Sequence, residues 1–478
     1  MRYWLVFLLY TVMFAITSGL IPEVSKPNIL FILTDDQDLM LDSLMVMPNL
    51  QELIYDFGIN FTNAFTTTPV CCPSRSSFLT GKYLHNTGVR NNSLQGNCSS
   101  SMWRQNQEPY TIPTYLSGYQ RMFTGKYLNA YDGSYVPPGW DNFIGLVGNS
   151  VYYNYKMNEN GVIINYGSNY DTDYLPNVML NKTLEFINAT QEPFFIYFSL
   201  PSPHQPADPP PQYSSLLNGT ISPRIPSWNK LTPDKHWFVE YFSVMNDNVV
   251  AYSDLLYRRR LLTLMWVDQI IKTLVENINL STTYVFFTSD NGYHLGEFAL
   301  PLDKRQPYEF DIRIPLAVRV PNSNTGTIDN RFVLNIDILP TILDIAGIDI
   351  PTDIDGISIF SNQSRDEFLV EYHGEYGYYC SATPANMDCY TQQQYQTPPY
   401  FEGAFFCACQ DARNNTYSCL RGIGYKYCEF DTSQLEYYDL DNDEFELNNT
   451  VGSLTYSEIE SLHRQLQSLQ ECEGATCH

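Results

Sequence analysis

The sequence contains few basic residues. Its 478 residues include 27 Lys and Arg against 52 Asp and Glu, which gives a formal charge of −25 at pH 7. Surfaces that coat nucleic acid or heparin are basic, so this balance excludes a general polyanion-binding surface and predicts no nucleic-acid partner. An anionic substrate would have to be met by a local cluster of cations.

Long apolar runs are also missing, except at the start of the chain. Arg2 is followed by an almost unbroken apolar run over residues 3–16 and then by small residues, which is typical of a signal peptide, here residues 1–19. That run is too short for a comfortable membrane span, and no later stretch is long enough to serve as one. We therefore expect a soluble mature chain that passes through the secretory pathway to the lysosome or the cell exterior.

Ten sequons for N-glycosylation support this compartment. A single Asn-X-Ser/Thr match arises easily by chance, but their number favours passage through the secretory pathway. The asparagines are Asn60, Asn91, Asn97, Asn181, Asn188, Asn218, Asn279, Asn362, Asn414 and Asn448.

Eleven cysteines in a secretory protein indicate disulfide bonds with one cysteine left over. Eight of them, from Cys380 to Cys477, lie in the last quarter of the chain, where short β-prone pieces alternate with turns. We interpret residues 366–478 as a smaller, disulfide-rich α+β subdomain. An amphipathic helix is expected near its end, over residues 456–469.

The chain between residues 26 and 365 alternates apolar strands with amphipathic helices. Strands are predicted at residues 29–33, 194–200 and 284–287, and helices at 177–187 and 261–278. This alternation predicts an α/β fold with a mostly parallel sheet. In such sheets, ligands bind outside the carboxyl ends of the strands.

Polar residues follow each of these strands. Asp35 and Asp36 end the first, His204 lies just beyond the second, and Asp290 and Asn291 end the third. Neighbouring side chains on a strand point to opposite faces of the sheet, so they can reach the same ligand only where the strand ends and the backbone turns. Three carboxylates and an amide oxygen favour Ca²⁺ or Mg²⁺ over zinc. Each pair taken alone is also explained by helix capping or turn formation.

The stretch TTPVCCPSRSSFLTGKY, residues 67–83, places two adjacent cysteines at the start of a predicted helix. Pro73 suits the first helical turn, and Gly81 can end the helix. Cys71 then lies at the helix N-terminus with Arg75 one turn further on, where backbone N–H groups and the guanidinium favour an anion. A cysteine there would be an activated nucleophile in the cytosol. In the secretory pathway the alternative is a disulfide, which the spacing alone does not exclude.

The motif CCPSR at residues 71–75, followed by LTGK at 79–82, resembles the C-x-P-S-R signature of the sulfatase family. Further motifs agree in the same order along nearly the full mature length: TGKYLN at 124–129, PH at 203–204, SDNGYH at 289–294 and DKR at 303–305. The resemblance implies an alkaline-phosphatase-like fold, with a large, mostly parallel sheet flanked by helices. It also implies a smaller C-terminal α+β subdomain with an antiparallel sheet.

In that family the first residue of the signature is converted to formylglycine. The resemblance therefore implies that Cys71 becomes 3-oxoalanine through the formylglycine-generating enzyme, and that the hydrated aldehyde attacks the sulfur of a sulfate ester. It also implies that this residue joins Asp35, Asp36, Asp290 and Asn291 at the Ca²⁺ or Mg²⁺ ion. Conversion of Cys71 leaves ten cysteines, an even number that disulfides can use.

The resemblance further implies a set of catalytic residues: Cys71, Arg75, Lys126, His204 and Lys304. The three cations would neutralise the sulfate oxygens, and His204 or Lys304 would protonate the departing alcohol. His294 and Arg305 are placed by motif near the mouth of the site, where they would contact the sugar. A polar residue packed on a loop explains each of these two equally well.

Within the family, residues 81–100, 125–129 and 300–306 favour the glucosamine-6-sulfatase group, with the heparan endosulfatases second. The endosulfatases carry a long basic insertion that this sequence lacks, which favours an exo-acting enzyme. The implied substrate is a sulfated glycosaminoglycan sugar, the 6-sulfate of N-acetylglucosamine in heparan or keratan sulfate. An endosulfatase or an arylsulfatase of other specificity stays open.

Two other classes of protein are also considered. A phosphatase or phosphodiesterase of the same superfamily would use Ser or Thr with zinc held by His and Asp, and both Cys71 and the Asn291 amide argue against it. The second is a secreted glycoprotein that binds sugar without catalysis. Its Cys71 would stay a thiol or pair in a disulfide.

Overall fold

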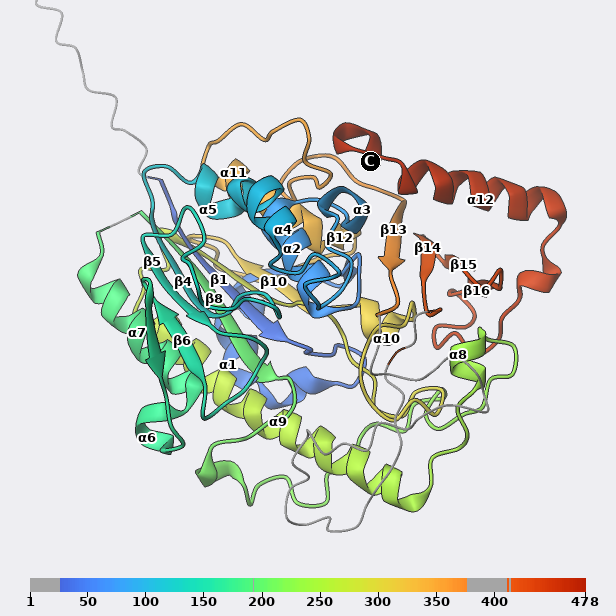
Figure 1. Ribbon diagram of the computed structural model, residues 1–478, viewed down its shortest axis with the longest axis horizontal. Coiled ribbons are helices and arrows are strands. Elements are labelled where there is room, and N and C mark those ends of the chain that lie inside the picture. Colours follow the sequence, from blue (N-terminus) through green and yellow to red (C-terminus); the bar gives the residue numbers. More distant parts are fainter. Residues whose placement is uncertain (1–25, 192, 376–410, 412–413) are drawn as a thin grey trace, which may run out of the picture.

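A ten-stranded sheet runs through the centre of the molecule in the order β11-β2-β10-β9-β1-β8-β4-β5-β6-β7 (Figure 1). The structure is a computed structural model that describes residues 26–191, 193–375, 411 and 414–478. The predicted signal peptide, residues 1–19, lies outside the described residues, as do four of the predicted disulfide cysteines, Cys380, Cys389, Cys407 and Cys409.

The five central strands of the sheet are parallel. In sheet order they are β9 (Thr283–Ser289), β1 (Asn28–Asp35), β8 (Phe194–Pro203), β4 (Gln120–Lys126) and β5 (Asn142–Leu146). All three predicted strands are therefore confirmed. Their runs of apolar residues are continuous because helices cover both faces of a parallel sheet.

Short strands extend both edges of the sheet, largely by antiparallel pairing. One edge has β10 (Leu316–Arg319), β2 (Gly58–Phe61) and β11 (Thr327–Asp329), and the other has β6 (Lys156–Glu159) and β7 (Val162–Asn165). Asn160 and Gly161 connect β6 to β7, with φ of 52° and 93°. Such a two-residue Asn-Gly turn matches the twist of a hairpin, so these strands pair antiparallel.

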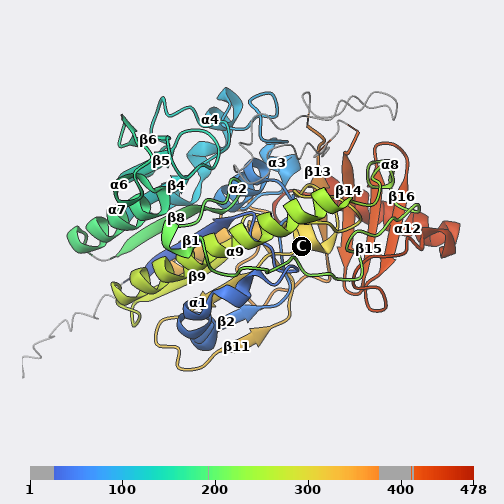
Figure 2. The same cartoon turned by 90° about the horizontal axis from the view of Figure 1, so that it is seen from below.

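Helices cover both faces of the sheet (Figures 1 and 2). On one face lie α2 (Cys71–Thr80) and α11 (Ile338–Ile345), and on the other α1 (Pro48–Leu53), α7 (Leu175–Ala189) and α9 (Asp247–Glu276). The two predicted helices correspond to α7 and to the second half of α9. The prediction missed the start of α9, where the Asn246 side chain accepts hydrogen bonds from the backbone N–H groups of Asn248 and Val249.

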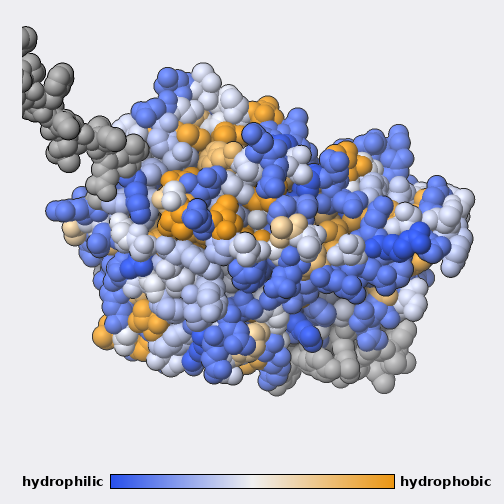
Figure 3. All heavy atoms as spheres, turned by 90° about the horizontal axis from the view of Figure 1, so that it is seen from above, coloured by the Kyte–Doolittle hydropathy of each residue, from blue (hydrophilic) through white to orange (hydrophobic). Residues whose placement is uncertain are grey.

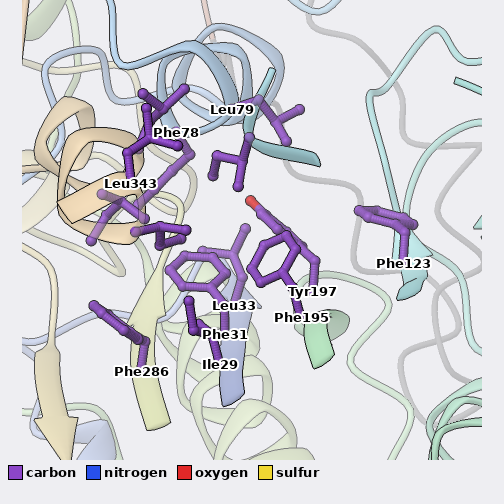
Figure 4. Close-up of a cluster of buried hydrophobic side chains, with 14 of the residues drawn as sticks. Ile29, Phe31, Leu33, Phe78, Leu79, Phe123, Phe195, Tyr197, Phe286 and Leu343 are labelled. Carbon is purple, nitrogen blue, oxygen red and sulfur yellow. The ribbon is translucent and has the colours of Figure 1, made fainter. Parts of the chain in front are cut away.

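Successive residues of β1 point to opposite faces of the sheet and enter two separate cores. Phe31 and Leu33 pack with Phe78 of α2 and Leu343 of α11, as Figure 4 shows. Leu30 and Ile32 belong to the core under α9. Each such fully buried side chain contributes about 1.5–3 kcal/mol to folding. Two buried layers thus fix the end of β1, from which the functional residues extend.

A second sheet forms the C-terminal part of the molecule. Its antiparallel strands are β13 (Glu367–Tyr372), β14 (Tyr417–Gly422), β15 (Tyr425–Phe430) and β16 (Leu435–Asp439), and helix α12 (Tyr456–Gln470) packs on it. Disulfides join Cys419 to Cys428 and Cys472 to Cys477. This confirms the predicted antiparallel α+β region and the helix near its end, whereas the division at residue 366 stays a proposal.

None of the helices in the described part of the chain is both long and apolar enough to cross a bilayer. On the face shown in Figure 3, apolar residues gather toward the middle and hydrophilic residues surround them.

Candidate active site

The carboxyl ends of the central strands bring the predicted polar residues together. Asp35 is the last residue of β1, Asp36 follows it, and Asp290 directly follows β9. One carboxylate oxygen from each of these three residues and the Sγ of Cys71 all lie within 4.8 Å of one another, and all four residues are buried. The predicted convergence at the strand ends is therefore present.

Cys71 is the first residue of α2 and has no disulfide partner. Its Sγ lies 3.8 Å from Oδ1 of Asp36. The neighbouring Cys72 is bonded to Cys98, and its backbone N–H donates to Oδ1 of Asn92 at 2.8 Å. Burial raises the pKa of the Cys71 thiol to about 12. The unmodified side chain is therefore a neutral thiol and a weak nucleophile.

Three cations pair with the three carboxylates. Nε of Arg75 lies 2.8 Å from Asp290, Nζ of Lys126 lies 2.8 Å from Asp35, and Nζ of Lys304 lies 2.6 Å from Asp36. A second nitrogen of Arg75 also reaches Asp35 at 3.2 Å. The predicted local cluster of cations thus exists at the strand ends. Buried charges are tolerated here because each has an opposite charge within contact distance.

The three carboxylates differ in their pKa. Burial alone would raise the pKa of Asp36, but Lys304 and His204 outweigh it and hold the value at about 2. The pKa of Asp35 is likewise held well below its usual range, mainly by Lys126. For Asp290, burial outweighs Arg75 and raises the pKa to about 7. Three chemically identical carboxyl groups therefore have different pKa values because their environments differ.

The set of donor atoms fits a hard divalent cation. The amide nitrogen of Asn291 donates to Asp36 at 2.9 Å and to the carbonyl of Gly292 at 2.8 Å. The amide oxygen, Oδ1, is buried and has no hydrogen-bond partner. An unpartnered buried oxygen is costly unless something else satisfies it. Together with three carboxylates, it supplies the oxygen ligands that Ca²⁺ and Mg²⁺ prefer.

His204 lies just beyond β8, beside the carboxylates. Its Nε2 is 3.8 Å from Oδ2 of Asp36, and its Nδ1 is 2.5 Å from the backbone oxygen of Gln205. Burial lowers the pKa of the ring to about 4, so the ring is neutral at neutral pH. The carbonyl of Gln205 then holds the hydrogen on Nδ1, and Nε2 faces the acids.

The two residues predicted to contact sugar are buried and already have ionic partners. Nδ1 of His294 lies 2.9 Å from Asp311. Arg305 pairs with Asp303 and, at 3.2 Å, with Glu375. A backbone bridge joins His294 to Asp303, next to Lys304. Both segments therefore lie beside the site, and direct contact of either residue with a sugar stays a prediction.

Sequence reasoning missed several residues that support the site. Ser150 donates a short hydrogen bond to Asp35, and Ser199 accepts one from Arg75 at 2.7 Å. Arg260 of α9 donates to the backbone oxygen of Asp36 at 2.6 Å. Ser199 lies near the polar end of β8 and could have been suspected. Ser150 lies in a loop and Arg260 in a helix, where nothing in the local pattern points to the strand ends.

The predicted glycosylation sites differ in exposure. The side chains of Asn60 and Asn97 are half-buried, and that of Asn91 is buried. The other seven are exposed: Asn181, Asn188, Asn218, Asn279, Asn362, Asn414 and Asn448.

The sequence and the fold both resemble known sulfatases. The Sulfatase family model matches residues 27–348. N-acetylglucosamine-6-sulfatase of Capra hircus is 39% identical over 490 residues, which cover 96% of this chain and 86% of that protein. The extracellular sulfatase SULF-1 homolog of Drosophila melanogaster is 41% identical over 371 residues, or 73% of this chain and 33% of that protein.

A solved structure shows the same fold. It is described as a complex with its substrate D-glucosamine-2-N,6-O-disulfate, and it matches with a TM-score of 0.71 at 22% identity, covering 93% of this chain and 98% of that one. This similarity concerns the fold alone. The family match spans more than half of the chain, and the relative from Capra hircus is similar along almost all of it. The chain therefore belongs to the sulfatase family, whose enzymes hydrolyse sulfate esters.

Proposed function

We propose that this sulfatase removes the 6-sulfate of N-acetylglucosamine in heparan or keratan sulfate, from the end of the glycosaminoglycan chain. The observation that carries the proposal is the buried cluster in which Cys71 and three carboxylates present ligand atoms within 4.8 Å of one another. The choice of sugar is supported by the name of the Capra hircus relative, N-acetylglucosamine-6-sulfatase. The absence of a long basic insertion supports exo action, and the predicted signal peptide supports a lysosomal or extracellular location.

Cys71 is the residue that we assign to formylglycine, formed by the formylglycine-generating enzyme. Its thiol is buried and unpaired, whereas the other cysteines of the described residues form disulfides. With a pKa raised to about 12 by burial, the thiol itself is a poor nucleophile. A hydrated aldehyde at this position would supply a hydroxyl group to attack sulfur. The start of α2 would hold that group beside the acids.

Asp35, Asp36, Asp290 and Asn291, together with the modified Cys71, would hold Ca²⁺, with Mg²⁺ as the alternative ion. When bound, such a cation lowers the pKa of a coordinated hydroxyl group and neutralises negative charge on the substrate. The chain's own cations complete the charge balance. Lys126 and Lys304 would share their ammonium donors between the aspartates and the sulfate oxygens, as electrostatic stabilisation of the reacting group requires.

His204 and Lys304 are the two candidates to protonate the departing alcohol. Lys304 lies beside Asp36 as a charged ammonium, whereas the neutral ring of His204 would first have to take up a proton on Nε2. Nε2 of His204 lies 3.8 Å and Nζ of Lys304 lies 2.6 Å from the carboxylate of Asp36. We expect the variants His204→Asn and Lys304→Met to show which of the two residues is the proton donor. The variant that lacks the proton donor should lose far more activity on a sugar sulfate than on an aryl sulfate, because a phenolate leaves without protonation. Equal losses on both substrates would exclude an acid role for that residue.

Mass spectrometry and substrate preference test the proposal. The peptide that contains Cys71, from protein made in a secretory host, should carry the aldehyde. Sulfate release from N-acetylglucosamine-6-sulfate should exceed release from galactose-6-sulfate or from an N-sulfated sugar. An active preparation that holds only unmodified Cys71 would overturn the nucleophile, and the opposite substrate order would overturn the assigned sugar.

A further inference from the structure

Helix α9 carries three consecutive arginines, Arg258, Arg259 and Arg260, in a chain with few basic residues. The helix runs along one face of the central sheet, and its N-terminal half extends toward the C-terminal part of the molecule (Figure 2). Arg258 donates to the backbone of Ser214 and Leu216 in a surface loop. Arg260 is only 1% exposed. It points away from the surface and into the ends of the strands.

The guanidinium of Arg260 joins the ends of three central strands. One nitrogen, Nη2, donates to the backbone oxygen of Asp36 at 2.6 Å and to the carboxylate of Asp38 at 2.8 Å, both just after β1. Nη1 lies 3.5 Å from the backbone oxygen of Pro203, the last residue of β8. The guanidinium also stacks 3.9 Å from the ring centre of Tyr293, which follows β9.

Asp36 has a backbone conformation that needs such support. Its φ is 66°, in the left-handed region that residues other than glycine seldom adopt. The N–H of Asp36 donates to Asp290 at 2.9 Å, and its carbonyl accepts from Arg260. Both backbone groups are thus fixed by side chains. In this conformation the carboxylate meets Nδ2 of Asn291 at 2.9 Å and Nζ of Lys304 at 2.6 Å.

We infer that Arg260 is a positioning residue for the cation site. It holds Asp36 in the left-handed conformation and so directs the Asp36 carboxylate toward Cys71 and Asn291. This inference rests on the proposed cation at the strand ends. Groups that orient a ligand through its backbone or side chain set metal affinity without touching the metal. If Arg260 were purely structural, replacing it would instead lower the stability of the fold and leave the affinity for a cation unchanged.

Calcium titration of the full-length, metal-free protein tests the inference. Isothermal titration with CaCl₂ compares the natural protein with Arg260→Lys, Arg260→Met and the control Arg258→Met on the same helix. We expect Arg260→Met to weaken Ca²⁺ binding about 10- to 100-fold, as the loss of a ligand-orienting group typically does. The Ca²⁺ affinity of Arg260→Lys should lie between those of the natural protein and Arg260→Met, because a lysine keeps the positive charge but lacks the planar guanidinium fork. Arg258→Met should bind Ca²⁺ like the natural protein.

The outcomes separate this inference from the proposed function. Natural Ca²⁺ affinity in a folded Arg260→Met or, if that variant does not fold, in Arg260→Lys would overturn the role of Arg260. No Ca²⁺ or Mg²⁺ binding by the natural protein would overturn the cation site and the inference with it. Weakened Ca²⁺ binding in the Arg260 variants, together with no sulfate release by the natural protein from N-acetylglucosamine-6-sulfate, would support the inference and overturn the proposed substrate.

Discussion

Two clusters of buried charge in this molecule have the same composition but different hydrogen bonding. Each contains three acids and three cations. The site cluster consists of Asp35, Asp36, Asp290, Arg75, Lys126 and Lys304. The interface cluster joins the C-terminal sheet to the rest of the molecule and consists of Glu309, Glu436, Glu446, Lys235, Arg421 and Lys426.

The interface cluster satisfies its polar groups internally. Lys426 lies 2.6 Å from Glu446 and 3.0 Å from Glu309. Lys235 donates to the Tyr438 hydroxyl and to the backbone oxygen of Glu446, both at 2.7 Å. Aromatic rings fill the space around the Lys235 ammonium, with the Phe298, Tyr308 and Tyr438 ring centres at 4.0, 4.2 and 4.3 Å. Nothing in this cluster needs a further ligand.

The site cluster, by contrast, surrounds groups that lack partners. Oδ1 of Asn291 accepts no hydrogen bond, and Cys71 is the free cysteine of the described chain. Shifted pKa values do not separate the two clusters, because burial lowers the pKa of Lys235 to about 8 and raises that of Asp290 to about 7. Perturbed titration is therefore a weak sign of function here. The buried Oδ1 of Asn291, which has no hydrogen-bond partner, is the feature that the six residues of the interface cluster lack.

The largest expected effect comes from the centre of the site cluster. Replacing Cys71 with Ala removes the side chain that would carry the attacking hydroxyl group. We expect sulfate release to fall on the order of 10⁴-fold or more, as for other catalytic nucleophiles. Measured without divalent cations, the free energy of unfolding should change by only about 1 kcal/mol, since only one or two buried side-chain atoms are lost. Sulfate release and urea unfolding measure the two quantities. Substantial turnover by Cys71→Ala would remove the functional distinction between the clusters.

The opposite pattern is expected from the interface cluster. Lys426→Met leaves Glu309 and Glu446 buried without their ammonium partner, which costs about 3–5 kcal/mol of stability. Activity per folded molecule should fall far less than in Cys71→Ala, because Lys426 touches no reacting group. Urea unfolding gives the first quantity, and turnover corrected for the folded fraction gives the second. Adding Glu446→Gln should recover part of the lost stability, and failure to do so would argue against the ion pair as the cause.

Removal of divalent cations should affect the site cluster alone. A Ca²⁺ concentration of 100 times the dissociation constant stabilises a folded protein by about 2.7 kcal/mol. A chelator should therefore lower the free energy of unfolding by about that amount and abolish turnover. Lys426→Met should show the same Ca²⁺-dependent gain as the natural protein, because the interface cluster has no open ligand position. Restoration of activity by zinc but not by calcium would contradict the oxygen-ligand argument.

The sequence predicted the parts of the site that follow from strand ends. The carboxyl ends of parallel strands lie at one edge of a sheet, which brings together Asp35, Asp36, Asp290 and Asn291. An apolar run that ends in an acidic residue can be recognised in the sequence. The same reasoning cannot locate Arg260, since its role depends on where a 30-residue helix packs relative to three strands.

The sequence pattern does not predict the interface cluster either. Lys235 and Glu446 are 211 residues apart, and Lys426 and Pro307 are 119 apart, yet each pair is hydrogen-bonded. A single lysine or glutamate usually lies at the surface, so no local pattern predicts that these are buried together. The hairpin of β6 and β7 was missed for another reason. Its strands are short, although the Asn160-Gly161 turn is a recognisable signal.

A second contact between the C-terminal part and the rest of the molecule should depend on pH. His85 lies in α3 (Leu84–Thr87), with Nδ1 2.8 Å from Glu371 of β13 and Nε2 2.9 Å from the backbone oxygen of Cys472. Both partners accept hydrogen bonds, so only the protonated ring can donate to both. Burial alone would lower the pKa of His85, but the hydrogen bond and charge of Glu371, with smaller contributions from the backbone oxygen of Cys472 and from Asp355, raise it.

Because the pKa of His85 is raised by folding, its contribution to stability is complete below the unfolded pKa of about 6.5 and is lost as pH rises through the folded pKa. His85→Gln should therefore cost about 1 kcal/mol near pH 5 and progressively less at higher pH, the value being small because the ring is partly exposed. Urea unfolding at both ends of this range measures the difference. The control is His463→Gln, whose ring pairs with Glu429 at 2.7 Å but is 42% exposed, so its effect should be smaller. A loss for His85→Gln that does not change with pH would mean that the ring contributes by packing rather than by charge, and that this contact belongs with the interface cluster.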